Sequence, residues 1–225
     1  MGPDQPHLEL IDQLVESALS QASTHGSLRD TPPMLARIRL HLQMGACPRH
    51  LAGLPRDLAQ IDNSLRNNMR AVAKAQAPWP LFIHGPVGTG KTCAALCLLD
   101  HCIGGGEYFT EIGLWKRLLF AETGRLVQSG EFGQVDSVLW PETIWRSLRR
   151  TWLVVLDEVG SRGQVSDALY DCTKEVLEVR LNKPLIMISN FGLERIAEIY
   201  DDRIASRLAA GTVVEVKGKD RRIEL

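Results

Sequence analysis

The stretch that decides the fold is Gly85-Pro86-Val87-Gly88-Thr89-Gly90-Lys91-Thr92. A glycine, four residues, and then glycine, lysine and threonine form the pattern of a phosphate-binding P-loop. The apolar run LFIH precedes this stretch and TCAALCLLDHC continues it, which predicts a strand before the loop and a helix after it. Glycines let successive backbone N–H groups surround a phosphate, and the following helix adds the positive end of its dipole. We therefore expect residues 85–92 to hold the phosphates of ATP, with Lys91 on the β- and γ-phosphates and the Thr92 hydroxyl on Mg²⁺.

A second acidic motif lies further along the chain. The apolar run at residues 153–156, LVVL, ends in Asp157 and Glu158. Ligands of parallel sheets bind at the carboxyl ends of the strands, so these carboxylates should face the phosphates. Asp157 would complete the Mg²⁺ site, and Glu158 would polarise a water for attack on the γ-phosphate. An acidic turn exposed to solvent is the simpler alternative, which the P-loop disfavours. The glutamate favours hydrolysis over transfer to a small acceptor, and we see no acceptor-binding arginine set of the kind a small-molecule kinase needs.

Polar residues near the C-terminus add to this site. Asn190 follows the apolar run PLIMIS and is predicted to contact the γ-phosphate or the attacking water, although asparagine is also common where a loop starts. Arg203 and Arg207 are four residues apart and share one helical face. They are either catalytic cations or a surface pair on an amphipathic helix. Arg221 and Arg222 are either a further phosphate-facing cation or part of a plain basic tail.

The composition excludes several classes of protein. The chain has 225 residues, 44% of them hydrophobic, and a formal net charge of −1, so any nucleic-acid surface must be local. No apolar run approaches the roughly 20 residues of a membrane span, and the acidic N-terminus does not resemble a secretion signal. Five cysteines without a CxxC pair argue against a cysteine-ligated metal site and fit a reducing cytoplasm. We expect a cytoplasmic protein with no membrane partner.

Apolar runs alternate with helical patterns from residue 81 onward, which predicts an α/β fold with a parallel sheet covered on both faces. Strands are expected in EYFTEI, WLVVLDE, PLIMISN and TVVEVKG, and helices over residues 113–150, 166–181 and 192–211. Before the sheet, we expect helices over residues 8–22, from Thr31, and from about Arg56 to Gln76, with a linker at residues 23–33.

The order of these motifs resembles the DnaC/DnaI family of replicative helicase loaders. The resemblance covers roughly Leu51 to Leu225 and rests on GPVGTGKT, LVVLDEVG, EVRLNKPLIMISN, DDRIASRL and VVEVKGKDRR. It implies an AAA+ ATPase core at residues 51–225, with a five-stranded sheet of order 5-1-4-3-2 and no C-terminal lid. A short helical region at residues 1–50 would then bind a partner. Asn190 matches the sensor 1 position of AAA+ proteins. One of Arg221 and Arg222 would serve as a sensor 2-like cation if the C-terminal segment is not simply a basic tail.

The family resemblance also implies partners. These are a hexameric replicative DNA helicase, single-stranded DNA, and further copies of the chain. Self-association would bring Arg207, with Arg203 beside it, to the neighbouring subunit's ATP as an arginine finger in trans. DNA or helicase could meet the basic residues of the N-terminal helices, which a solvated helix exterior explains equally well. A second candidate surface combines aromatic and basic residues, namely Trp115, Lys116, Arg117, Trp145, Arg146, Arg149 and Arg150. Packing in the core is the alternative for the tryptophans.

Two other functions remain open at the level of sequence. The chain also resembles IstB-type ATPases that assist transposition, which share the same core motifs. A nucleotide-gated binding module with negligible turnover would use ATP only to stabilise one conformation. The presence of both Glu158 and Asn190 argues against that module.

Overall fold

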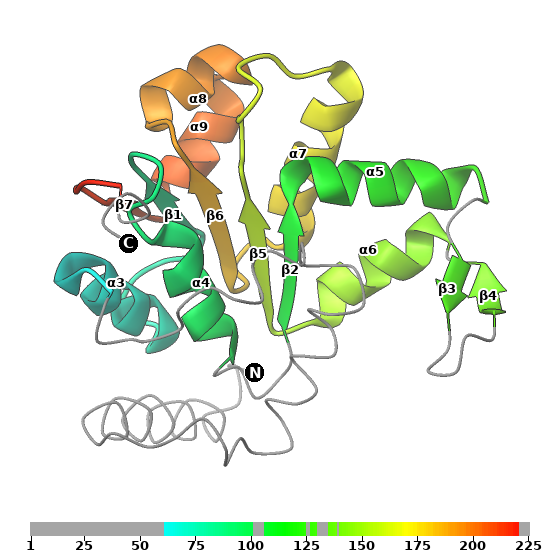
Figure 1. Ribbon diagram of the computed structural model, residues 1–225, viewed down its shortest axis with the longest axis horizontal. Helices are drawn as coiled ribbons and strands as arrows, with labels where there is room; N and C mark the ends of the chain where they lie inside the picture. The colour runs from blue at the N-terminus through cyan, green and yellow to red at the C-terminus, as the bar shows by residue number, and fades with distance from the viewer. Residues whose placement is uncertain (1–60, 101–105, 125–126, 130–134, 139, 221–225) are drawn as a thin grey trace.

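The computed structural model of the chain describes residues 61–100, 106–124, 127–129, 135–138 and 140–220. The expected N-terminal helical region, its boundary at residue 51, and Arg221 and Arg222 lie outside these residues. The described residues form a sheet of five parallel strands with helices on both faces (Figure 1). Among them, no helix is long and apolar enough to cross a membrane.

The sheet has the order β2-β5-β6-β1-β7. The bounds of its strands are Leu81–His84 for β1, Gly106–Thr110 for β2, Leu153–Asp157 for β5, Leu185–Ser189 for β6 and Thr212–Glu215 for β7. Numbered along the chain, the five strands lie in the order 2-3-4-1-5, which is the predicted 5-1-4-3-2 seen from the other edge. His84 is in register with Ser189, so the P-loop and Asn190 leave the sheet at the same edge.

Successive side chains along each strand point to opposite faces of the sheet, so the hydrophobic core has two halves, one on each face. In β1, Leu81 and Ile83 point to one face of the sheet and Phe82 to the other, and all three are fully buried. Strands buried on both sides are nearly continuous apolar runs, which is why the sequence pattern located β1, β5 and β6.

Seven helices cover the two faces within the described residues. The first face is covered by α3 (Asn63–Ala73) and α4 (Lys91–Asp100). The second face is covered by α5 (Glu111–Glu122), α6 (Pro141–Arg150), α7 (Asp167–Val179), α8 (Leu193–Ile199) and α9 (Asp202–Ala209).

The prediction of continuous helix over residues 113–150 is wrong. Helix α5 ends at Glu122, and Gly124 follows at φ 65° with its N–H on the Ala121 carbonyl, 3.1 Å away. A glycine in the left-handed conformation is a common helix terminator. Strands β3 (Val127–Ser129) and β4 (Val135–Val138) then pair antiparallel, and α6 starts beyond them. The pair lies at the far ends of α5 and α6, away from the main sheet (Figure 1).

Two further helix boundaries differ from expectation. The predicted helix over residues 192–211 is divided into α8 and α9, because Asp201 is extended and its side chain caps the Ile204 N–H. The predicted helix from Arg56 begins, in the described residues, only at Asn63, where the Asp62 side chain caps the Leu65 N–H. Aspartate at an N-cap stabilises a helix start by about 1 kcal/mol, and this capping signal outweighs apolar periodicity at both places.

Candidate nucleotide site

The P-loop joins β1 to α4 and depends on its glycines. Gly85, Gly88 and Gly90 have φ values of 142°, 76° and 91°, which side chains rarely adopt. A Cβ on Gly85 would lie 2.1 Å from the Val216 carbonyl oxygen, and one on Gly88 would lie 1.7 Å from Asp220 Oδ1. The segment after β7 therefore lies directly against the loop, and two of the three glycines also make room for it.

Lys91 is 6% exposed, and its ammonium lies inside the loop. Its Nζ donates to the carbonyl oxygens of Gly85 and Pro86, each 2.7 Å away, and to Asn190 Oδ1 at 3.0 Å. The Thr89 hydroxyl donates to the same Pro86 carbonyl at 2.9 Å, while Val87 at the tip is exposed. The structure thus brings Lys91 and Asn190 together from positions 99 residues apart, with the ammonium at the N-terminus of α4.

Asp157 and Thr92 meet across the same edge. The Thr92 hydroxyl donates to Asp157 Oδ2 at 2.7 Å, and the Tyr108 hydroxyl donates to the same oxygen at 2.7 Å. The Glu158 N–H donates to Asp157 Oδ1, also at 2.7 Å. A carboxylate beside a hydroxyl is a donor set that suits Mg²⁺, which takes few protein ligands and completes its shell with phosphate and water oxygens. In the described ranges, no group of three or more His, Cys, Asp or Glu is placed to hold a metal ion.

Glu158 differs from Asp157 in both exposure and backbone. Asp157 is 4% exposed, whereas Glu158 is exposed to solvent and has φ 61°. A non-glycine residue in this conformation costs on the order of 1 kcal/mol and persists only where its surroundings fix it. Such residues cluster at functional sites. The turn points the Glu158 side chain to solvent at the edge where Lys91 and Thr92 lie.

Ser189 and Asn190 divide two tasks at the end of β6. Ser189 is buried, and its hydroxyl donates to the Val159 carbonyl at 2.7 Å and accepts from the Phe191 N–H at 3.1 Å. Ser189 therefore fixes the backbone between the two neighbouring strand ends. Asn190 is exposed and reaches Lys91 with its side chain.

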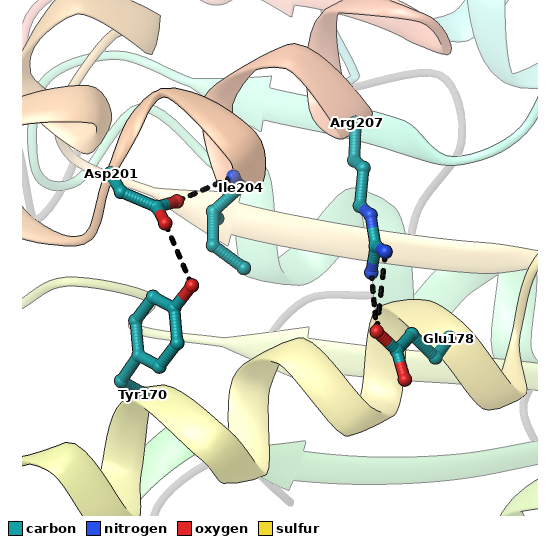
Figure 2. A network of polar contacts seen from close by, with 5 residues as sticks. All are labelled: Tyr170, Glu178, Asp201, Ile204 and Arg207. Carbon is teal, nitrogen blue, oxygen red and sulfur yellow. Dashed lines mark hydrogen bonds and ion pairs between the residues drawn. The ribbon is translucent and has the colours of Figure 1, made fainter.

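The structure does not bring Arg203 and Arg207 to the P-loop. Both are exposed on α9, and in the described part of the chain neither has a hydrogen bond or ion pair to the loop, Asp157 or Glu158. Arg207 instead points to α7, where both terminal nitrogens lie 3.2 Å from Glu178 Oε1 (Figure 2). Both partners are 42% exposed, so the pair contributes at most about 1 kcal/mol.

Three residues of this region were not found from the sequence. Tyr108 contacts Asp157, and its signal was available, since a tyrosine in a buried strand needs a partner for its hydroxyl. Asp220, beside Gly88, follows the last strand and carries no recognisable pattern. Glu111 is buried in the first turn of α5, where an acidic residue is ordinarily explained by the helix dipole.

The aromatic and basic residues of α5 and α6 divide into core and surface. Trp115 and Trp145 are half-buried and pack against the core, so the packing interpretation holds for both. Arg117 is also half-buried, and desolvation lowers the pKa of its guanidinium. The exposed members of the set are Lys116, Arg146, Arg149 and Arg150, and Trp140, before α6, is 61% exposed.

The fold is similar to those of several solved structures. The replication initiator DnaA bound to AMPPCP and single-stranded DNA matches with a TM-score of 0.57 and 17% identity, over 70% of this chain and 46% of that one. The chain therefore spans just under half of DnaA. DnaI matches with a TM-score of 0.55 and 19% identity, over 78% of this chain and 94% of that one. The DnaC helicase loader matches with a TM-score of 0.55 and 18% identity, over 76% of this chain and 100% of that one.

No protein-family model matches the chain, and no curated protein matches it by sequence. The likeness is therefore one of structure. Sheet order, P-loop and neighbours agree, and the chain has the AAA+ P-loop fold of DnaA, DnaI and DnaC.

Proposed function

We propose that the chain binds ATP with Mg²⁺ and hydrolyses it. The observation that carries this proposal is the meeting of Lys91 with Asn190, and of Thr92 with Asp157, at one sheet edge beside the exposed Glu158. Phosphate oxygens would replace the carbonyls that Lys91 now contacts, and the backbone of residues 85–90 would surround them. Bound Mg²⁺, held by Thr92 and Asp157, would neutralise the negative charge that develops on the phosphates.

Hydrolysis assigns separate tasks to Glu158 and Asn190. Glu158 would accept a proton from the attacking water, because its carboxylate is exposed next to the buried Asp157. Asn190 would contact the γ-phosphate or that water from the neighbouring strand. Arg207 would complete the site of an adjacent subunit, with Arg203 beside it, and must leave Glu178 to do so.

We further propose a role in DNA replication, in which ATP-driven self-assembly loads a hexameric helicase onto single-stranded DNA. The structural likeness to the DnaC helicase loader and to DNA-bound DnaA supports this role. Three exposed residues would supply stacking and phosphate contacts, namely Lys116 of α5, Trp140 just before α6, and Arg146 of α6. Residues 1–50 are proposed as the region that binds the protein partner.

Glu158→Gln tests the catalytic assignment. The amide cannot accept the proton, so ATP turnover should fall at least about 100-fold while ATP affinity stays within about 2-fold. Steady-state phosphate release and equilibrium binding of a fluorescent ATP analogue measure the two quantities. Glu122→Gln, an exposed glutamate at the end of α5, is the matched control and should behave as wild type. Persistent turnover in Glu158→Gln would contradict the assignment.

A further inference from the structure

The backbone that follows Glu158 is held by hydrogen bonds from several elements. The Val159 N–H donates to the Ile188 carbonyl at 2.9 Å, which ties it to β6. The Gly160 N–H donates to two oxygens at once, Glu111 Oε2 at 3.2 Å and the Tyr200 hydroxyl at 3.0 Å. These contacts fix the turn that keeps Glu158 in its left-handed conformation.

Glu111 is the centre of this arrangement. It is 1% exposed, and its Oε1 accepts hydrogen bonds from the hydroxyls of Thr173 (2.7 Å) and Tyr200. All its hydrogen-bond donors are neutral, and no cation pairs with it in the described residues. Burying a carboxyl group without a cation costs stability, so a purely structural position would be better filled by a neutral side chain.

Tyr200 connects the turn after Glu158 to a second part of the structure, the junction of α8 and α9. It lies at the C-cap of α8, and the next residue, Asp201, caps α9, the helix of Arg203 and Arg207. Its hydroxyl accepts from Gly160 and donates to Glu111, so both of its hydrogen-bonding functions are used. The hydroxyl therefore joins the turn after Glu158 to α5 and to the α8–α9 junction.

We propose that Glu111 and Tyr200 are positioning residues that hold the Glu158 turn in its catalytic geometry. This inference rests on the proposed ATPase function and adds two residues to it. In the described residues, neither side chain has a hydrogen bond or ion pair to the P-loop or Asp157, so they should act on turnover and leave nucleotide binding unchanged. Misplacing a catalytic group by about 1 Å costs on the order of 100-fold in rate.

The test compares Tyr200→Phe and Glu111→Gln with Tyr170→Phe. Tyr170 is the matched control, because its hydroxyl also donates to a carboxylate, Asp201 Oδ2 at 2.7 Å (Figure 2). In the described part of the chain, Tyr170 has no hydrogen bond to residues 158–160. Tyr200→Phe and Glu111→Gln should lower kcat at least about 10-fold, with affinity for a fluorescent ATP analogue within about 2-fold of wild type. Tyr170→Phe should keep wild-type kcat. Hydrogen exchange of the 158–163 amides should accelerate in Tyr200→Phe alone of the two tyrosine variants.

Four outcomes test this inference and separate it from the proposed function. Wild-type kcat in both Tyr200→Phe and Glu111→Gln, beside an inactive Glu158→Gln, would overturn the positioning role and leave the ATPase intact. Parallel losses of kcat, ATP affinity and Tm would also overturn it, because they indicate a merely structural role. Absence of turnover in wild type would reject the proposed hydrolysis, and the positioning role with it. Unchanged hydrogen exchange of the Gly160 amide in Tyr200→Phe would reject the hydrogen bond from Gly160 to Tyr200.

Discussion

At the residue scale, the P-loop shows how one position can meet two demands. Gly88 combines φ 76° with a would-be Cβ only 1.7 Å from Asp220 Oδ1. Glycine provides the conformation at no steric cost, and its missing side chain admits the segment after β7. The loop and this segment must therefore change together.

Gly88→Ala separates these two demands when compared with Gly124→Ala. Gly124 has φ 65° but no atom within 4 Å of the added Cβ, so its variant reports the conformational cost alone, about 1 kcal/mol of unfolding free energy. Gly88→Ala carries the same cost and must also displace Asp220. We expect ATP affinity to fall at least about 10-fold in Gly88→Ala and to stay unchanged in Gly124→Ala, measured by equilibrium binding and denaturant titration. Equal affinities would show that the loop tolerates the side chain.

At the element scale, Arg180 fastens the ends of helices and strands to one another. It is 2% exposed, and its two terminal nitrogens donate to four backbone carbonyls, those of Leu148, Thr151, Trp152 and Pro184. Two of these belong to the C-terminal end of α6, where a cation is favourable. Burial lowers the pKa of Arg180 to about 10, which leaves it charged at neutral pH.

Arg180→Met should be strongly destabilising. It removes the guanidinium from four backbone carbonyl oxygens, of which that of Pro184 keeps another donor, the Val154 N–H at 3.2 Å. Each lost partner costs on the order of 1 kcal/mol, so we expect a loss of at least about 3 kcal/mol in the free energy of unfolding. Urea denaturation measures it. Arg195→Met, at an exposed arginine of α8, is the control and should lie within about 0.5 kcal/mol of wild type. A loss below about 1 kcal/mol in Arg180→Met would mean that water replaces the guanidinium.

The elements that could be predicted from sequence are those with strong local patterns. LFIH, LVVL and PLIMIS are apolar on both faces, and GPVGTGKT fixes the strand–loop–helix unit between the first of them and α4. Strands β3 and β4 were not predicted, because each is only three or four residues long and neither contains an apolar run. Gly124 was the sequence feature that indicated the end of α5 before these strands.

The candidate site divides in the same way. Lys91, Thr92, Asp157 and Glu158 follow from motifs, because the chemistry of phosphate and Mg²⁺ fixes both residue type and spacing. Tyr108, Glu111 and Tyr200 contact that chemistry only through tertiary structure, across separations of 40 to 89 residues. No local pattern encodes such contacts.

At the scale of the whole molecule, the two arginines of α9 lie away from the chain's own phosphate site. Arg207 is exposed and held by Glu178 of α7, so a role in catalysis requires a neighbouring subunit. The exposed ion pair is weak enough to exchange for a phosphate.

Mixing two inactive variants tests that arrangement. Arg207→Ala retains Glu158, and Glu158→Gln retains Arg207, so a mixed assembly contains interfaces with both groups. We expect the mixture to regain up to about a quarter of wild-type turnover, and to be more active than either variant alone. A phosphate-release assay across a series of mixing ratios measures this. Arg203→Ala in place of Arg207→Ala shows which arginine acts. Mixtures no more active than their components would contradict catalysis in trans.

ATP-dependent co-elution with the replicative helicase of the same source, with light scattering to give the mass, addresses helicase loading most directly. Wild type with ATP and Mg²⁺ should form a complex of defined mass, and Lys91→Ala should not, because it loses the buried ammonium of the P-loop. Absence of a complex under every nucleotide condition, from a wild type that binds ATP, would contradict helicase loading.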